Sequence, residues 1–277
     1  MDRELFWIVS VFVFALGASI ASFLNVVIWR VPRGESIVKP ASHCPKCDAP
    51  IHWYQNIPIL SYLALGGACA NCKAPISPRY ILVETLGGLL FWFVFVRFAA
   101  FQPPTFESAF IVVVMWIWVS LMIAGSFIDF DHKLLPDFTT VGGMILGVAS
   151  ALVYVLAFHC PWSYFLISLS GLALGFGLLY LVRFLGSLIF RREAMGLGDV
   201  FLMGAVGAMF GPVAVLLTII LSSIFGSVVG LSLVALSKTK RGHFVEIPFG
   251  PYICLGCLVY MFYGRELVSW YLRLLGF

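Results

Sequence analysis

Met195-Gly196-Leu197-Gly198-Asp199 stands at the mouth of an apolar run that carries no charged residue from Val200 to Ser237. A charged cluster, Arg191-Arg192-Glu193, precedes it. Such a run predicts membrane-spanning helix, because about 20 consecutive apolar residues suffice to cross a bilayer as a helix. An acidic side chain at its mouth is costly in lipid, so Asp199 is a candidate functional residue. This stretch therefore indicates the class of protein and gives one candidate position for chemistry.

The composition of the whole chain agrees with a membrane protein. Of the 277 residues, 61% are hydrophobic and only 11% are charged. Because backbone groups in lipid must be hydrogen-bonded within their own segment, the spans should be helices. The basic residues are confined to a few loops, so the net charge of +4 reports on topology and does not indicate a nucleic-acid partner. The sequence predicts an all-α polytopic protein embedded in the lipid bilayer.

About eight transmembrane helices are expected from the apolar runs. The run after Asp199 is too long for one span, and Gly211-Pro212 divides it into a short and a longer helix. The first run is too long for the core of a signal peptide, so it is interpreted as a retained span. The expected spans are 5–28, 81–100, 109–128, 138–158, 162–190, 200–210, 213–236 and 252–275.

The distribution of Lys and Arg predicts the orientation of these spans. The loops after the first, third, fifth and seventh spans carry basic residues, and the loops after the second, fourth and sixth carry none. Basic loops face the cytoplasm, so both termini are expected outside. Asp129, Asp137 and Asp199 are then expected at the cytoplasmic ends of their spans.

Asp199 becomes a strong candidate only if a second carboxylate lies beside it. Asp129, which ends another long apolar run, is the best partner. Two carboxylates that share one proton can hydrolyse an amide without a metal. The alternative is that each Asp merely caps or anchors a helix. Asp131 and Asp137 compete with Asp129; Asp137 is expected to be the N-cap of the following span and Asp131 to be solvated.

Two Cys-x-x-Cys pairs lie in the polar loop between the first two spans. Cys44 and Cys47 form one pair and Cys69 and Cys72 the other, with 21 residues between the pairs. This spacing predicts a tetrahedral four-thiolate zinc site that would stabilise a loop lacking its own core. Two disulfides are the alternative, but thiols stay reduced in the cytoplasm. The similar pair at 254–257 lies within an apolar span, where small buried side chains are expected.

Charged residues also fall inside expected spans, and two of them lie well within long apolar runs. Glu84 belongs to the second span and Arg183 to the fifth. A charged side chain within a span pairs with a partner or extends its charge toward the interface. The sequence leaves open whether these two residues pair with each other.

Seven short motifs follow one another along nearly the whole chain. They are SFLNVVIWR (22–30), CPKC (44–47), NIPILSY (56–62), CANC (69–72), DFDHKLLPD (129–137), GLGD (196–199) and PFGP (248–251). In this order they resemble the type IV prepilin peptidases, which are multi-pass aspartic proteases of the bacterial inner membrane. The resemblance implies that the catalytic aspartates are Asp129 and Asp199. It also implies that zinc is bound by the cysteines of the polar loop, Cys44, Cys47, Cys69 and Cys72.

The resemblance further implies the substrates and a second activity. Members cut the basic leader of type IV prepilins or type II secretion pseudopilins after a glycine, at the cytoplasmic face of the membrane. Many also methylate the new N-terminal residue with S-adenosylmethionine, which is expected here by resemblance only, since the chain has no glycine motif of soluble methyltransferases. The alternatives are a peptidase without methyl transfer and a proton-coupled transporter, for which inverted repeats would be expected.

The expected organisation has three parts. Residues 1–28 form the first transmembrane helix, and residues 29–80 form a small cytoplasmic zinc-binding loop domain associated with methyl transfer. Residues 81–277 form a seven-helix membrane peptidase domain. In this arrangement both predicted catalytic carboxylates belong to the last part.

Overall fold

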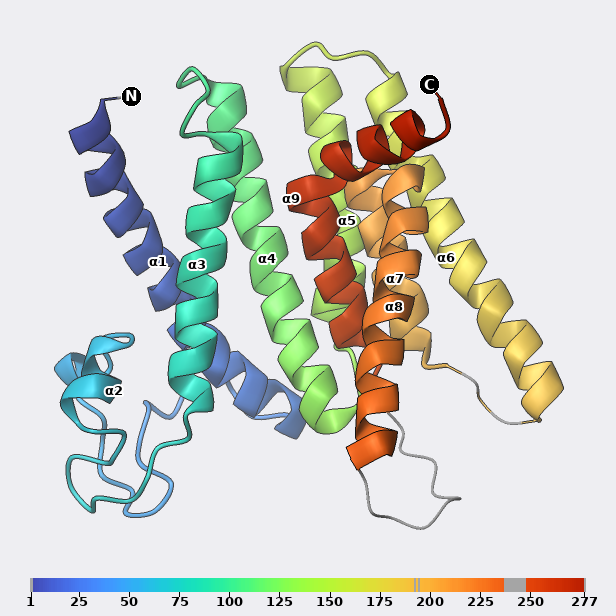
Figure 1. Cartoon of the computed structure of the whole chain (residues 1–277). Helices are drawn as coiled ribbons and strands as arrows, with labels where there is room; N and C mark the ends of the chain where they lie inside the picture. Colours follow the sequence, from blue (N-terminus) through green and yellow to red (C-terminus); the bar gives the residue numbers. More distant parts are fainter. Residues whose placement is uncertain (1, 192, 194, 237–247, 277) are drawn as a thin grey trace. The chain divides into compact units, whose positions relative to one another are not determined.

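The computed structural model describes residues 2–191, 193, 195–236 and 248–276 (Figure 1). Within these residues the chain is mostly helical, and β-structure is limited to isolated bridges in the loop after the first helix. The predicted all-α fold is therefore confirmed. The elements are α1 (Arg3–Arg30), η1 (Val31–Arg33), η2 (Trp53–Gln55), α2 (Leu60–Ala64), α3 (Arg79–Phe98), α4 (Phe106–His132), α5 (Asp137–Ala157), α6 (Ser163–Phe190), α7 (Leu197–Phe210), α8 (Pro212–Leu236) and α9 (Gly250–Leu274).

Each expected span corresponds to one of the long helices, but not all of these helices have the dimensions of a full crossing. Among the described residues, six helices are long and apolar enough to span a membrane, namely α1, α3, α4, α5, α6 and α8. Helix α7 has 14 residues, which at 1.5 Å per residue gives about 21 Å against a hydrocarbon core of about 30 Å. Arg265 and Glu266 interrupt the apolar stretch of α9, whose axis bends in Figure 1. The protein is a multi-pass membrane protein, and the expected number of eight spans is approximate.

The predicted break between α7 and α8 is confirmed at Gly211. This residue has φ 83° and ψ −177°, a region that is essentially restricted to glycine. Pro212 follows as the first residue of α8, where a missing N–H costs no helical hydrogen bond. Residues of one apolar run thus form two helices with different directions.

Two compact units make up the chain, Met1–Ala124 and Gly125–Phe277. In the first unit α1 packs along α3. A Cβ at Gly17 would stand 2.7 Å from the carbonyl oxygen of Gly87, so the two helices approach at residues without side chains. Small residues allow such close packing of helices in lipid. The polar loop that holds the cysteines connects these two helices.

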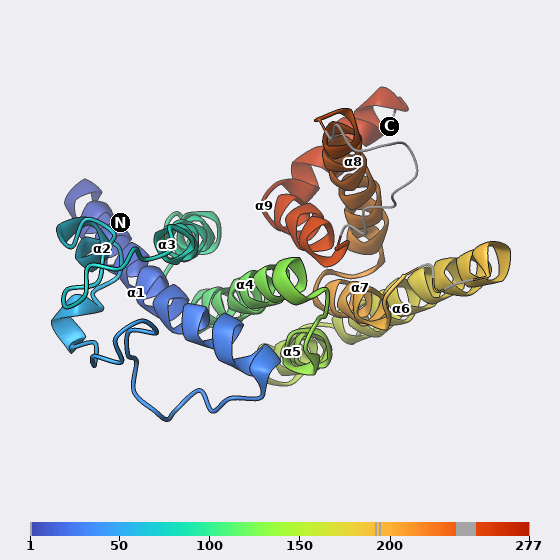
Figure 2. The same cartoon turned by 90° about the horizontal axis from the view of Figure 1, so that it is seen from below.

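In the second unit α7 lies between α5 and α6 (Figure 2). The backbones of α6 and α7 meet at Gly171 and Gly207, where a Cβ on either residue would collide with the other helix. The Ser168 hydroxyl also donates a hydrogen bond to the Ala208 carbonyl oxygen at 2.7 Å. The short helix that begins beside Asp199 is thus held by its two neighbours and not by its own length.

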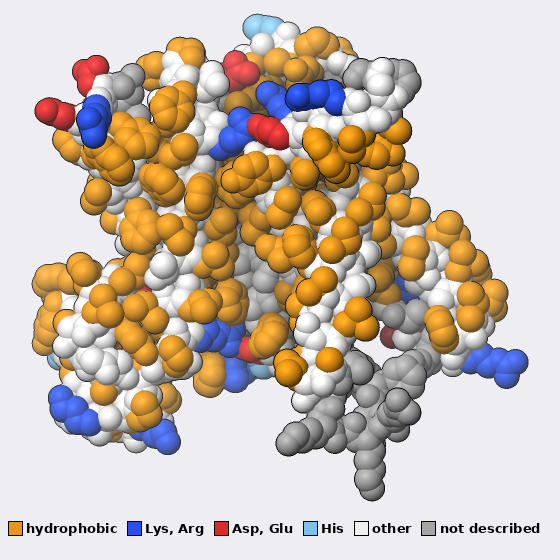
Figure 3. Space-filling view, viewed as in Figure 1, with side chains coloured by type: hydrophobic (Ala, Val, Ile, Leu, Met, Phe, Trp, Pro, Cys, Tyr) orange, Lys and Arg blue, Asp and Glu red, His pale blue; other side chains and the backbone are white. Residues whose placement is uncertain are grey.

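The helices of the second unit alternate in direction. The last turn of α4 and the ends of α6 and α8 lie on the same side as the starts of α5, α7 and α9 (Figure 1). In Figure 3 hydrophobic side chains lie over much of the face formed by α8 and α9, as expected for helices in lipid, and charged side chains gather near the C-terminal end of α9. The predicted basic loop 238–241 and Arg192 lie outside the described residues.

Candidate active site and metal centre

Asp129 lies in the last turn of α4 and is 5% exposed. Its Oδ2 accepts a hydrogen bond from the backbone N–H of Gly250 at 3.1 Å. Gly250 is the first residue of α9, and the first N–H groups of a helix have no partner within the helix. The start of α9 therefore supplies a donor that fixes one oxygen of the Asp129 carboxylate.

Gly250 is a site residue that sequence reasoning did not single out. A Cβ at this position would stand 2.5 Å from Asp129 Oδ2, closer than such atoms can approach. The contact therefore requires glycine. The available signal was the Gly-Pro pair of the PFGP motif at the start of the last apolar run, but the sequence did not indicate what this glycine contacts.

Asp199 lies in the first turn of α7 and is 9% exposed. Gly196 is the N-cap of this helix, so Asp199 occupies the third helical position, from which a side chain can reach back to the N–H of the cap. The carboxylate lies close enough to the Gly196 backbone to interact with it. The positive end of a helix dipole also favours a carboxylate at this position.

The structure brings Asp129 and Asp199 together within the second unit. Their charges are close enough to interact. The Leu135 side chain lies against both Gly198 and Gly250, and so packs beside the starts of both α7 and α9. Two buried carboxylates from different helices, each beside a glycine backbone, thus lie close to one another.

The two competing aspartates are not part of this pair. Asp131 and Asp137 are both exposed. The prediction that Asp137 is the N-cap of its helix is wrong, since the cap is Pro136 and Asp137 is the first helical residue. Pro136 has the extended backbone of a cap residue, φ −65° and ψ 148°, and its carbonyl oxygen accepts the Thr139 hydroxyl at 2.7 Å.

The two Cys-x-x-Cys segments fold as two equivalent turns in the first unit. In one, the Cys44 N–H donates to the Ala49 carbonyl oxygen at 2.9 Å. In the other, the Cys69 N–H donates to the Ala74 carbonyl oxygen at 2.9 Å. Each turn presents its two thiols toward the other turn.

The four thiols form a group that could hold a metal ion. The sulfur atoms of Cys44, Cys47, Cys69 and Cys72 all lie within 4.8 Å of one another, and all four cysteines are free. The Sγ atoms of Cys44 and Cys72 are 3.8 Å apart. Zn–S bonds of about 2.3 Å in a tetrahedron separate the sulfur atoms by about 3.8 Å. The residues therefore fit the predicted metal, and the disulfide alternative is not observed.

Backbone groups around Cys47 and Cys69 favour the thiolate that a metal requires, whereas burial and the neighbouring thiols raise the pKa of Cys72 to about 11. Hydrogen bonds from the backbone of Cys72 and Asn71 lower the pKa of the Cys69 thiol to about 6. The Ala49 backbone and the Asn71 side chain likewise lower the pKa of Cys47. The third Cys-x-x-Cys pair, Cys254 and Cys257, is buried in α9 as predicted and lies outside the metal group.

Glu84 anchors the cysteine loop to α3. This side chain is 7% exposed, and its Oε2 accepts the backbone N–H of Ile59 at 2.8 Å. Ile59 has φ 64°, which is rare for a β-branched residue and indicates strain held by its surroundings. Within the second unit, Arg183 pairs with Glu193 at 3.1 Å.

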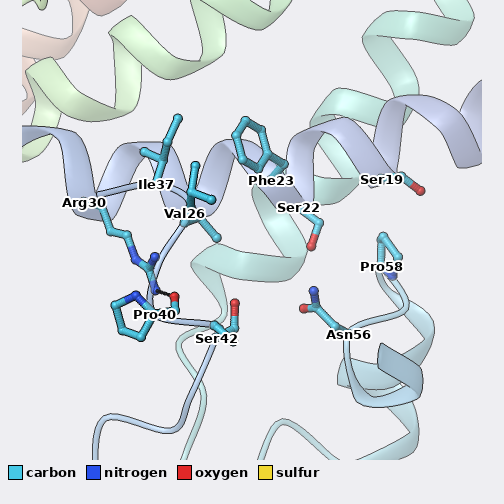
Figure 4. Close-up of a pocket in the computed structure, with 12 residues that line it drawn as sticks. Ser19, Ser22, Phe23, Val26, Arg30, Ile37, Pro40, Ser42, Asn56 and Pro58 are labelled. Atoms are coloured by element: carbon cyan, nitrogen blue, oxygen red, sulfur yellow. Dashed lines mark hydrogen bonds between the residues drawn. The ribbon is translucent and has the colours of Figure 1, made fainter. Parts of the chain in front are cut away.

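A pocket of about 320 Å³ lies between α1 and the loop in the first unit (Figure 4). Ser22, Ser42 and Asn56 contribute polar side chains to its lining, and Val26 and Ile37 contribute apolar ones. No acidic residue is among the lining residues. The pocket can therefore receive a molecule with both polar and apolar parts.

Family models match both halves of the chain. The model described as the bacterial peptidase A24 N-terminal domain matches residues 15–98. The model described as the type IV leader peptidase family matches residues 116–231. The first match contains all four loop cysteines, and the second contains Asp129 and Asp199.

Curated relatives are similar over most of the chain. A prepilin leader peptidase/N-methyltransferase from Myxococcus xanthus is 42% identical over 84% of this chain and 65% of its own length. A type 4 prepilin-like proteins leader peptide-processing enzyme from Escherichia coli is 36% identical over 87% of this chain and 88% of its own length. A prepilin leader peptidase/N-methyltransferase from Pseudomonas aeruginosa is 33% identical over 95% of this chain and 93% of its own length. No solved structure gives a significant match.

Proposed function

Because the chain belongs to the type IV leader peptidase family, we propose that it is a prepilin leader peptidase. It is an aspartic endopeptidase that removes the basic leader of type IV prepilins or type II secretion pseudopilins after a glycine. The observation that carries this proposal is the buried pair Asp129 and Asp199, each beside a glycine backbone at the start of a helix. The names of the relatives from Myxococcus xanthus, Escherichia coli and Pseudomonas aeruginosa support the substrate class.

The proposed chemistry uses one proton shared between the two carboxylates, because two adjacent carboxylates cannot both ionise without a large cost. The ionised carboxylate accepts a proton from a water molecule as that water attacks the scissile carbonyl. The protonated carboxylate donates its proton to the carbonyl oxygen. The N–H of Gly250 holds one oxygen of Asp129 and leaves the other for this exchange. Asp129 and Asp199 are thus the proposed catalytic residues.

The proposed location is the bacterial inner membrane, with the active site at the cytoplasmic face. A prepilin has a basic leader followed by an apolar helix, which can enter the bilayer laterally. The carboxylate pair lies where α4 ends and α7 begins, so a scissile bond at the boundary between leader and helix would reach it. Carboxylates at the boundary also attract the basic residues of the leader.

We also propose that the loop 29–80 is a zinc-binding domain and that 81–277 is the peptidase domain. Zinc would be held by Cys44, Cys47, Cys69 and Cys72, whose sulfur atoms all lie within 4.8 Å of one another. When bound, it supplies structural cross-linking of a loop that has few buried apolar residues. The protein's own contribution is the pair of turns and the anchor at Glu84.

A second activity, N-methylation of the new N-terminal residue, is proposed from the names of two relatives. We propose that S-adenosylmethionine binds in the pocket beside α1, where Arg30 in the lining would face its carboxylate (Figure 4). Ser22, Ser42 and Asn56 would bind the amino-acid end, and Val26 and Ile37 would pack on the purine. When bound, S-adenosylmethionine supplies the activated methyl group. The residues of the pocket would bind and orient it.

One experiment tests both activities. Purified protein is incubated with a prepilin, with and without S-adenosylmethionine, and the products are weighed by mass spectrometry. Cleavage after glycine in wild type but not in Asp199→Asn supports the peptidase, and uncut substrate with wild type contradicts it. A mass gain of one methyl group on the cut product, seen only with S-adenosylmethionine, supports the transferase. Cut but unmethylated product leaves a peptidase alone.

A further inference from the structure

Arg183 places a cationic side chain within the apolar helix α6, where its side chain is 18% exposed. A charge within a membrane helix is costly, so its contacts indicate what it does. Its Nη1 donates a hydrogen bond to the Met195 carbonyl oxygen at 2.9 Å. Its Nη2 pairs with Glu193 Oε1 at 3.1 Å, but the Glu193 side chain is 80% exposed. An exposed ion pair contributes little, so the bond to the Met195 carbonyl is the more important contact.

The Met195 carbonyl and the Gly196 N–H belong to the same peptide group. The Asp199 carboxylate lies beside the Gly196 backbone, and its Oδ2 lies 3.6 Å from the position that a Gly196 Cβ would occupy. The carbonyl of this peptide group therefore accepts from Arg183, and the Gly196 end of the same group lies next to the Asp199 carboxylate. The chain of contacts runs from guanidinium to peptide to carboxylate.

A peptide group is planar, so fixing the direction of its carbonyl also fixes the direction of its N–H. Gly196 has no side chain to restrict its backbone, and the segment before α7 is not part of a helix. Arg183 is the group that restricts this peptide from the side opposite the carboxylate. Hydrogen bonds in such a chain also polarise one another, which strengthens the bond to the carboxylate.

We propose that Arg183 is a positioning residue for peptide cleavage, acting through the Met195–Gly196 peptide to hold the Asp199 carboxylate in its reactive orientation. The inference rests on the proposed function, because it takes Asp199 as one of the two reacting carboxylates. It goes beyond that function by assigning a role to the half-buried cation of α6. The alternative is a purely structural role, in which Arg183 only holds the segment before α7 against α6 through its ion pair with Glu193.

Three variants separate these alternatives. Arg183→Met keeps the aliphatic stem and removes every donor. Arg183→Lys keeps the charge and one donor that can reach the Met195 carbonyl. Glu193→Gln is the matched control, because it removes the ion pair and leaves the bond to the carbonyl in place. None of the three changes a group that touches the scissile bond.

The measurement is the rate of prepilin cleavage over a range of substrate concentrations, together with the unfolding temperature of each purified variant. Misplacing a catalytic group by about 1 Å costs about 100-fold, so Arg183→Met should lower kcat by about that factor. KM should stay within about twofold, because Arg183 does not contact the substrate. Arg183→Lys should recover part of the loss, and Glu193→Gln should cleave at close to the wild-type rate.

The inference is overturned if wild type cleaves and folded Arg183→Met keeps the wild-type kcat. It is also overturned if Glu193→Gln loses as much activity as Arg183→Met, since the ion pair would then be the important contact. If Arg183→Met does not fold, kcat of Arg183→Lys is compared with kcat of Glu193→Gln. The inference is overturned if Glu193→Gln loses as much kcat as Arg183→Lys. If wild type does not cleave any prepilin, the proposed function fails, and this inference fails with it.

Discussion

The carboxylate pair and the cysteine group differ in what holds their reactive atoms in place. Asp129 and Asp199 are buried and lie at helix termini, with backbone N–H groups directed at their oxygens. The cysteines lie in a polar loop, and only Cys44 is buried. Helix packing therefore organises the first site, whereas a bound metal would organise the second.

This difference indicates how each site should respond to change. The carboxylate site depends on a few close approaches of backbone to side chain, so small additions of volume should disturb it strongly. The cysteine site depends on the number of thiolates, so it should fail when one ligand is lost and should tolerate changes elsewhere. The following predictions test this contrast, from the largest expected effect to the smallest.

Asp129→Asn and Asp199→Asn should each lower prepilin cleavage by at least about 1,000-fold, since a proton acceptor or donor of this kind contributes about 100- to 10,000-fold. Asparagine can neither accept the proton of the water nor return it. The double variant should be no worse than either single variant, because groups that act as a unit are not additive. Rates of leader cleavage and the zinc content are measured together. Loss of zinc in these variants would show that the two sites are not independent.

Gly250→Ala should lower cleavage by about 100-fold, the effect expected for moving a reacting group by about 1 Å. The added Cβ would stand 2.5 Å from Asp129 Oδ2, so the carboxylate must move. Gly142→Ala is the matched control, because a Cβ there meets nothing within 4 Å. Cleavage kinetics and unfolding temperature are compared for both. Equal activity of the two variants would remove Gly250 from the site.

Cys44→Ser and Cys72→Ser should each remove most of the bound zinc, because a structural site needs all four thiolates. The loop should then become sensitive to proteolysis, while cleavage of prepilin falls less than in the aspartate variants. Cys254→Ser is the control, since this buried thiol lies outside the metal group. Metal analysis and limited proteolysis are the measurements. Unchanged zinc in the loop variants would contradict the metal site.

Asp131→Asn and Asp137→Asn should change cleavage by less than about twofold, as is usual for exposed substitutions away from a site. Both residues are exposed, and the start of α5 is capped at Pro136. The same cleavage assay is used. Loss of activity in Asp137→Asn with retention in Asp129→Asn would move the first carboxylate of the pair to the start of α5.

Much of the fold could be predicted because it depends on local patterns. Long apolar runs predict helices wherever the backbone must satisfy its own hydrogen bonds, and all expected spans are helical in the described residues. The break at Gly211-Pro212 was predictable from the conformations that these two residue types adopt. The grouping of the four cysteines followed from the spacing of their two pairs.

Predictions that depend on contacts between distant segments were less successful. The sequence left open whether Glu84 and Arg183 pair, and the structure directs each to a different backbone group. Asp137 was expected to cap its helix, but the backbone of Pro136 determines where that helix begins. In each case several partners have suitable chemistry, and sequence pattern does not give the distance to any of them.

The sequence by itself determined that this is a polytopic helical membrane protein with candidate carboxylates at two helix ends and a four-thiolate loop. Residue type and spacing suffice for this, because hydropathy and metal ligation are properties of the residues themselves. Only the tertiary structure decided that Gly250 bonds Asp129 and that Arg183 reaches the peptide next to Asp199. Each of these contacts uses a backbone N–H or carbonyl group, which nearly every residue carries. Residue type therefore does not show which backbone group a side chain will meet, and the packing of the helices decides it.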